Sequence, residues 1–191
     1  MHRDPGISTA GSKVSFESIR PLHWQGYGLK SAFIGEVATR GGHVYLTLDG
    51  SEYAFSAQQS TEISKNLLQT FGIYAKLGVL QPDDEQKDLL GGCEIWQQIM
   101  AKRLGSTSLP SMHVFKGTTH GWEFVASADF ERPDNPSSGS RYHRVCIALD
   151  EEISLPCISI DNRAFAFSIV DALWLIENLQ IAGYLAAMAD E

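Results

Sequence analysis

The chain contains two similar segments whose residue numbers differ by a constant 112. Residues 46–75 align with residues 158–187 without a gap. The identical pairs are Asp49/Asp161, Ala54/Ala166, Phe55/Phe167, Ser56/Ser168, Asn66/Asn178, Leu67/Leu179 and Ala75/Ala187. Because self-similarity at a fixed separation is typical of repeated supersecondary units, the repeat predicts the same order of elements at two places in the chain.

The first half of each copy is typical of a β-hairpin. Residues 44–55 alternate between apolar and polar side chains and are rich in β-formers, interrupted only by Asp49 and Gly50. A two-residue turn of this kind favours the type I′ conformation, which needs positive φ at both central positions. Asp161 and Asn162 occupy the matching turn in the second copy. Each copy therefore begins with two antiparallel strands.

The second half of each copy is typical of a capped helix. Ser56 is a good N-cap, and Gln59 stands three residues later, as in a capping box. Ser168 and Asp171 have the same spacing in the second copy, where a carboxylate is also favourable near the helix N-terminus. We expect the second helix to continue to about residue 188.

The most apolar stretch, residues 164–188, belongs to this second helix. It contains Asp171, Glu177, Asn178 and Gln180. A membrane span of about 20 residues rarely accepts so many polar groups. An apolar helix of this kind is normally central in a soluble protein, so we expect it to form the core.

The predicted fold class is α+β, with an antiparallel sheet and helices packed on it. A strand preceding each hairpin would make each unit β-β-β-α. The expected divisions are a flexible N-terminus at residues 1–13 and a single domain at residues 14–191, with repeat units at about residues 29–78 and 144–188, a middle helix and hairpin at residues 82–130, and a flexible loop at residues 131–141.

Composition excludes several classes of protein. Hydrophobic residues make up 43% of the 191 positions and charged residues 20%, which is unlike a disordered chain. The net charge of -8, without a dense Lys/Arg block, disfavours direct binding to nucleic acid. Three cysteines without a C-x-x-C pair argue against a disulfide framework and indicate a reducing cytoplasm.

Candidate catalytic residues are few. Cys93 follows two glycines, and a Cys with a distant His is a conceivable nucleophile and base. His113 and His120, with His143 and Cys146, would be the side chains for a metal site. Their spacing matches no standard zinc pattern, so we expect no metal and no cofactor. A metal- or thiol-dependent enzyme remains the alternative function.

The matching asparagines Asn66 and Asn178 admit two interpretations. One is a pair of polar contacts related by the repeat. The other, which we favour, is that each amide makes a hydrogen bond within its own helix or to water.

Partner-binding candidates lie outside the repeat. Trp24 and Tyr27 stand in a Pro/Gly-punctuated stretch, and exposed aromatic side chains are frequent interface anchors. Two acidic runs could steer a basic partner towards the protein. These runs are Asp83, Asp84 and Glu85, and Asp150, Glu151 and Glu152.

The sequence favours a non-enzymatic, acidic protein-binding module. We expect it to inhibit another protein by steric and electrostatic blocking of a basic surface, one that normally handles nucleic acid. Phage anti-defence proteins and bacterial immunity proteins are analogous in class. A structural homo-oligomer is a third hypothesis, in which Gly183 and Ala187 allow close packing of the final helix against a second copy.

Overall fold

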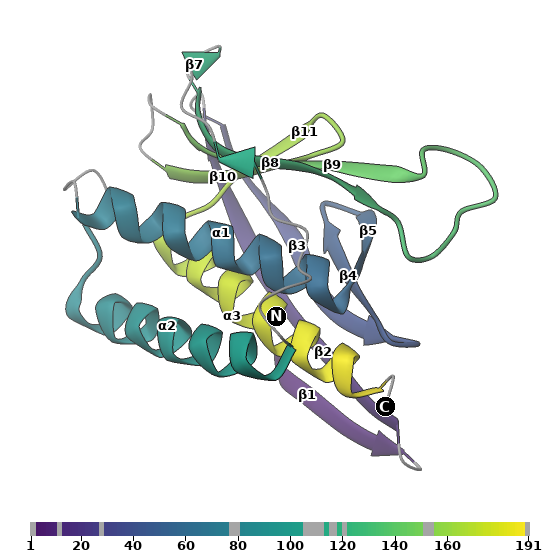
Figure 1. The fold of residues 1–191 in the computed structure, drawn as a ribbon. Coiled ribbons are helices and arrows are strands. Elements are labelled where there is room, and N and C mark those ends of the chain that lie inside the picture. Colours follow the sequence, from purple (N-terminus) through teal and green to yellow (C-terminus); the bar gives the residue numbers. More distant parts are fainter. Residues whose placement is uncertain are drawn as a thin grey trace.

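The computed structural model contains two antiparallel sheets and three long helices (Figure 1). It describes residues 3–10, 13–26, 29–76, 81–104, 113–114, 118–119, 122–150 and 155–189. The fold is therefore of the predicted α+β class.

The first sheet is a meander in which each strand pairs with its neighbour in sequence. Its order is β1-β2-β3-β4-β5, and a helix, α1, follows directly. The bounds are β1 Arg3–Ala10, β2 Lys13–Gly26, β3 Leu29–Arg40, β4 His43–Leu48, β5 Ser51–Ser56 and α1 Ala57–Lys76.

The second sheet has the order β11-β10-β9-β8-β6, with β7 also paired to β8, and it too is followed directly by a helix, α3. Helix α2 connects the two halves along the chain. The bounds are α2 Asp84–Leu104, β6 His113–Val114, β7 Thr118–Thr119, β8 Trp122–Glu131, β9 Tyr142–Asp150, β10 Leu155–Ile160, β11 Arg163–Ala166 and α3 Ile169–Ala189.

The hairpins and helix starts occur where the repeat predicts them. Strands β4 and β10 have bounds that differ by 112, and β5/β11 and α1/α3 begin at the same separation. Both turns have positive φ at their two central residues: 49° and 74° in the first, 51° and 70° in the second. The backbone of these turns is therefore of the left-handed kind that a type I′ hairpin requires.

The predicted helix caps are present. In α1, Ser56 and Gln59 form the reciprocal bonds of a capping box, at 3.1 and 2.9 Å. In α3, the backbone N–H of Asp171 donates to the Ser168 hydroxyl at 3.2 Å. Each cap satisfies N–H groups that would otherwise lack a partner at the helix start.

The structure differs from the predicted unit in the number of strands. In the described part of the chain, the five strands β1–β5 precede α1 and the six strands β6–β11 precede α3, where three were expected before each helix. One additional strand in the first sheet, β2, includes the Pro/Gly-punctuated stretch, and Pro21 pairs with Ile34 of β3. Residues 3–10, for which a flexible end was expected, form β1. The local composition of these segments is not typical of strands, so it did not predict them. Pairing with a neighbouring strand in a long hairpin overrides local propensity.

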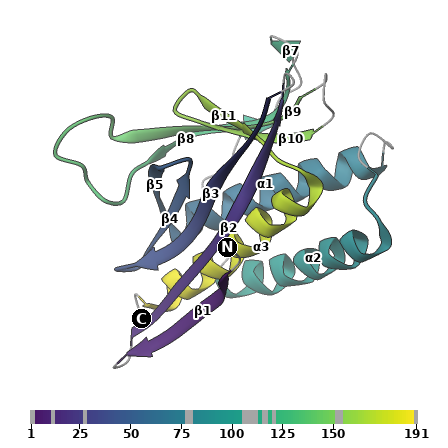
Figure 2. The same cartoon turned by 180° about the vertical axis from the view of Figure 1, so that it is seen from behind.

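Helices α1 and α3 exchange their sheets. Helix α3 packs against β2, β3 and β4 and, less extensively, against β10, while α1 packs against β8, β9 and β10 of the second sheet as well as β4 and β5. Seen from behind, β2 and β3 cross over α3 (Figure 2). Helix α3 is long and apolar enough to span a membrane, but 61% of its apolar window is buried inside the protein. Its environment is that of a core helix in a soluble protein.

Buried polar contacts fix the crossing of α1 and α3. The hydroxyls of Ser60 and Ser64 donate to the backbone carbonyls of Leu179 and Ile176, each at 2.8 Å. Gly183 lies against α1, since a Cβ there would stand 2.7 Å from Thr61 Oγ1 and 3.0 Å from the carbonyl oxygen of Ala57. The close-packing face that the oligomer hypothesis assigned to a second copy is thus occupied by α1 of the same chain.

Helix α2 is continuous through Gly91 and Gly92, although glycine lowers the stability of a helix interior. A Cβ at either glycine would meet no atom within 4 Å. Neither glycine is therefore required by close packing within the described part of the protein. Helix α2 packs on α3 and, less extensively, on α1.

The Gly183→Ala substitution tests the helix contact. The added methyl group would push Thr61 and the backbone of Ala57, both in α1, away from α3, so we expect the free energy of unfolding to fall by about 1–3 kcal/mol. The control is Gly72→Ala in α1, where the Cβ has open space and the free energy of unfolding should rise by about 0.5–1 kcal/mol. Urea denaturation measures both. Equal changes for the two variants would contradict the packing role of Gly183.

Candidate functional site

The thiol of Cys93 lies inside the protein. Its residue is 6% exposed, on the side of α2 that faces α3. Burial raises the pKa of the thiol to about 11, and the carboxylates of Glu177 and Glu94 act in the same direction. The nucleophilic thiolate is therefore scarce near neutral pH.

The remaining cysteine and histidine candidates do not gather into one site. His113 lies in β6, where only its backbone is described, and His120 lies outside the described residues. Cys146 is half-buried in β9, where burial raises its thiol pKa. Within the described part of the chain, no three His, Cys, Asp or Glu side chains converge as metal ligands do.

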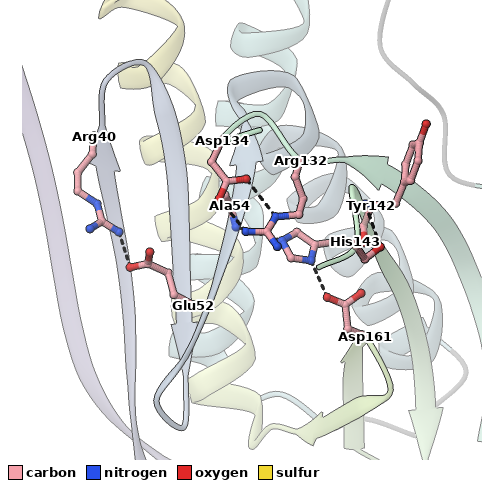
Figure 3. Close-up of polar contacts among 9 residues, drawn as sticks. Arg40, Glu52, Ala54, Arg132, Asp134, Tyr142, His143 and Asp161 are labelled. Carbon is pink, nitrogen blue, oxygen red and sulfur yellow. Dashed lines mark hydrogen bonds and ion pairs between the residues drawn. The ribbon is translucent and has the colours of Figure 1, made fainter. Parts of the chain in front are cut away.

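His143 forms a buried polar contact between the two sheets (Figure 3). Its Nδ1 lies 2.6 Å from Oδ2 of Asp161, the first residue of the β10–β11 turn. Its Nε2 accepts a hydrogen bond of 3.3 Å from the backbone N–H of Ala54 in β5. The proton therefore belongs on Nδ1, donated to Asp161, in a neutral ring.

This histidine and aspartate resemble a catalytic dyad only in composition. Both ring nitrogens of His143 are occupied, and its side chain is 4% exposed. The ring packs against Tyr53 and Phe55, with centroids 5.5 Å from each. Asp161 also accepts a bond of 2.9 Å from the backbone N–H of Arg144. The geometry supports a structural role, in which His143 satisfies an N–H at the edge of the first sheet.

A shallow concavity of about 630 Å³ lies beside this contact, under the loop at residues 131–141. Its charges compensate one another in pairs. Arg144 binds Asp129 at 2.9 Å, and Arg132 binds Asp134 at 2.7 Å. The backbone N–H of Arg132 donates to the carbonyl of Arg141 at 2.8 Å and closes the loop for which flexibility was expected. Both arginines that line the concavity are therefore already paired with carboxylates.

A deeper groove of about 500 Å³ lies between β2, α2 and α3. Helix α3 forms its floor, and α2 and β2 form its two sides. The described lining residues are Ser18 and Arg20 from β2, Glu85, Asp88, Leu89, Gly92 and Cys93 from α2, and Val170, Leu173, Trp174, Glu177, Asn178, Gln180 and Ile181 from α3.

The rim of this groove is acidic. Glu85, Asp88 and Glu177 are all exposed. Among the described lining residues, Arg20 is the one cation, and it pairs with the buried carboxylate of Asp171 at 3.2 Å. Apolar surface accompanies the charges, because Leu89 and Val170 are 46% and 42% exposed. The groove is therefore suited to a ligand that is cationic and partly apolar.

The floor of the groove has an incomplete hydrogen-bond set. Trp174 donates its indole N–H to the Ser18 hydroxyl at 3.2 Å. Asn178 donates from Nδ2 to the backbone carbonyl of Trp174 at 2.7 Å, which is a bond within its own helix, as expected. Its Oδ1, in a side chain that is 2% exposed, has no partner.

The predicted partner-binding residues have different places in the structure. Asp83, Asp84 and Glu85 are exposed at the start of α2, and Glu85 lines the groove. Trp24 lies in β2 and Asp150 ends β9, but their side chains are not described. Tyr27, Glu151 and Glu152 lie outside the described residues.

Sequence reasoning missed Arg20, Asp88 and Glu177 as groove residues. A single charged residue on the surface of a helix or strand gives no signal of the cavity that it will border.

No family model matches the chain, and no curated protein or solved structure is significantly similar to it.

The variant His143→Phe tests the structural role of the histidine. Phenylalanine keeps an aromatic ring against Tyr53 and Phe55 but removes both hydrogen bonds, leaving the Ala54 N–H without its partner. We expect the free energy of unfolding to fall by about 1–3 kcal/mol. His43→Phe, at a half-buried histidine of β4, should change it by less than about 0.5 kcal/mol. A stable His143→Phe protein would show that the contact between sheets is dispensable.

Alkylation tests the assigned state of Cys93. In the native protein at pH 7.5, we expect iodoacetamide to modify Cys93 far more slowly than a free thiol, because the thiol is buried and protonated. In urea it should react at the ordinary rate. Peptide mass spectrometry assigns the modified residue. Fast modification of native Cys93 would restore the thiol-enzyme hypothesis.

Proposed function

We propose that this protein is a non-enzymatic, acidic binding module whose groove between β2, α2 and α3 takes a basic segment of a partner protein. The observation that carries the proposal is the combination of an exposed acidic rim with a half-buried arginine that is paired with a buried carboxylate. Glu85, Asp88 and Glu177 face solvent, while the charge of Arg20 is already neutralised by Asp171. A cationic partner therefore meets attraction without an opposing charge in the described lining.

The charge of the whole chain supports the same partner. A net charge of -8 attracts basic surfaces over distances comparable to the screening length, about 8–10 Å at ordinary ionic strength. The same field repels the phosphate backbone of a nucleic acid. Asp83 and Asp84 extend the acidic rim along the start of α2.

The finer form of the proposal concerns what binding achieves. A module of this kind would act as an inhibitor, by covering a basic surface that normally binds nucleic acid. Phage anti-defence proteins and bacterial immunity proteins act in this general way, and the cytoplasm is the compartment in which such a partner and three free cysteines would both be found.

The two alternative functions have less support. A thiol enzyme needs a reactive cysteine, whereas Cys93 is buried with a raised pKa. A homo-oligomer through the final helix needs a free small-residue face, whereas Gly183 packs against Thr61 of the same chain.

Site-specific cross-linking tests the proposed partner. With p-benzoylphenylalanine in place of Leu89 in the groove, we expect irradiation in host-cell lysate to capture a protein through a segment rich in Lys or Arg. The matched position is Ile34 of β3, which is 51% exposed against 46% for Leu89 and lies away from the groove. Mass spectrometry identifies the cross-linked segment. A neutral or acidic segment at position 89 would contradict the proposal.

Charge reversal then tests the rim. The double variant Glu85→Lys, Glu177→Lys should weaken binding of the captured segment about tenfold at low salt, and less as salt is raised. The control double variant Glu17→Lys, Glu94→Lys reverses two other exposed carboxylates. Each Glu→Lys change adds two charges, so both variants go from -8 to -4. Equal losses in the two variants would assign the effect to net charge and not to the groove.

A further inference from the structure

We propose that the basic segment of the partner is an amphipathic α-helix, whose apolar side docks on an exposed stripe of α2 formed by Leu89, Gly92 and Ile95. This inference rests on the proposed function and specifies the form of the ligand. Leu89 and Gly92 line the groove, so the stripe is continuous with it. The proposal above requires a basic segment of any conformation, whereas this one requires a helix that crosses α2 at Gly92.

The first step of the argument is the exposure of the stripe. Leu89 is 46% exposed, and Ile95 is 61% exposed, the largest value among the large apolar side chains that the structure describes. Gly92 lies three residues from each of them, and residues three apart are neighbours on the surface of a helix. Helix α2 packs on α3 and α1 through a different side, which carries Leu90 and Cys93. The stripe is therefore continuous and open to a partner.

The second step concerns Gly92. A glycine in the interior of a helix lowers its stability relative to alanine. Packing within the described part of the chain does not require this glycine, because a Cβ there would meet no atom within 4 Å. At Gly183 of α3 the corresponding space is filled, since a Cβ would stand 2.7 Å from Oγ1 of Thr61 in α1. Gly183 thus admits a helix of the same chain, whereas the space at Gly92 is open to a helix from outside.

The third step compares the dimensions of the stripe with those of a helix. Leu89 and Ile95 are about 9 Å apart along the axis of α2, since an α-helix rises 1.5 Å per residue. A helix with its side chains is about 10 Å across. A partner helix therefore fits across α2 between these two side chains, with its apolar residues, three and four apart, over Gly92. An extended segment would need free backbone groups to pair with, and the interior of α2 offers none.

The fourth step defines the charge of the partner helix. Glu85 and Asp88 are exposed and lie about one helical turn before the stripe. In the described part of the chain neither carboxylate has an ion pair, whereas the neighbouring Asp84 pairs with Lys87 at 3.3 Å. Lys or Arg residues beside the apolar side of the partner helix would reach these two carboxylates. Charge pairs of this kind at an interface rim increase the association rate and fix the orientation of the partner.

The probe for the test is a synthetic peptide of about 18 residues, or five helical turns. Leucines recur three and four residues apart, and lysines occupy the other positions. Titrated into the purified full chain, it should bind saturably, with more helical circular dichroism than the sum of the separate spectra. The control peptide has the same composition and charge, with its leucines distributed around the helix, and should bind at least tenfold more weakly. Equal affinities for the two peptides would overturn the proposal, because charge alone would then explain binding.

The double variant Leu89→Ser, Ile95→Ser removes the apolar part of the stripe. We expect it to weaken binding of the helical peptide at least tenfold and to leave the melting temperature unchanged, because both side chains are exposed. The control double variant Ile34→Ser, Met188→Ser removes two apolar side chains outside α2 that are 51% and 50% exposed. It should leave peptide binding unchanged. Equal losses in the two double variants would overturn the assignment of the stripe.

The variant Gly92→Gln tests the crossing point. A side chain at this position would separate the two helices, so we expect peptide binding to weaken at least tenfold. Gly91→Gln is the matched control, since a Cβ at Gly91 also has open space but Gly91 is not one of the residues that line the groove. It should bind the peptide as the unchanged protein does. Unchanged binding in Gly92→Gln would show that no helix crosses α2 there.

Cross-linking from position 95 tests a second copy of this chain as the occupant. With p-benzoylphenylalanine in place of Ile95, irradiation of the purified protein alone should leave it monomeric, because the acidic residues beside the stripe would repel those of a second copy. A cross-linked dimer would assign the stripe to a second copy and overturn the proposal.

The two proposals can fail separately. If the segment captured from position 89 is basic but the helical peptide and its control bind equally, the protein binds a basic partner and the helix assignment is wrong. If the captured segment is not basic, the proposed function fails, whatever the peptides do.

Discussion

The close crossing of α1 and α3 is the contact on which the rest of the fold depends. It rests on Gly183, which allows α3 to approach Thr61, and on two serine hydroxyls that bond to backbone carbonyls of the neighbouring helix. Because of this crossing, α3 reaches the first sheet and α1 reaches the second. Helix α2 then packs on the outside of α3, and the groove forms where α2, α3 and β2 meet. The candidate site is thus a consequence of how the two helices cross.

The local features of the fold could be predicted from the sequence, and the long-range ones could not. Asp49 and Asp161 identified both hairpin turns, and Ser56 and Ser168 identified both helix starts, because short-range geometry decides these positions. The exchange of helices between sheets leaves no local signal, since it depends on surfaces far apart in the chain, more than 100 residues in the case of α3 and the first sheet. Strand β2 was missed because its partner in a long hairpin, and not its own composition, makes it a strand.

The candidate site was predictable in part for a similar reason. Glu85 was identified from its acidic run, and it does line the groove. Asn178 was interpreted as bonding locally, which is correct for its Nδ2. The state of its Oδ1 depends on what α2 and β2 place around it, and no pattern within α3 contains that information. His143 was considered only as a metal ligand, because its two partners, Ala54 and Asp161, belong to different sheets.

The exchange of helices has a consequence for synthesis of the protein. On the ribosome, the first five strands emerge early, but the helix that covers three of them, α3, begins more than 100 residues after the last of these strands. Apolar side chains of the first sheet, such as Val37 and Leu46, therefore cannot be buried by α3 until more than 100 further residues have been synthesised. A nascent chain in this state exposes sheet surface that can associate with other chains. Cellular yield of this protein should depend on how quickly translation reaches α3, and on the chaperones present in the meantime.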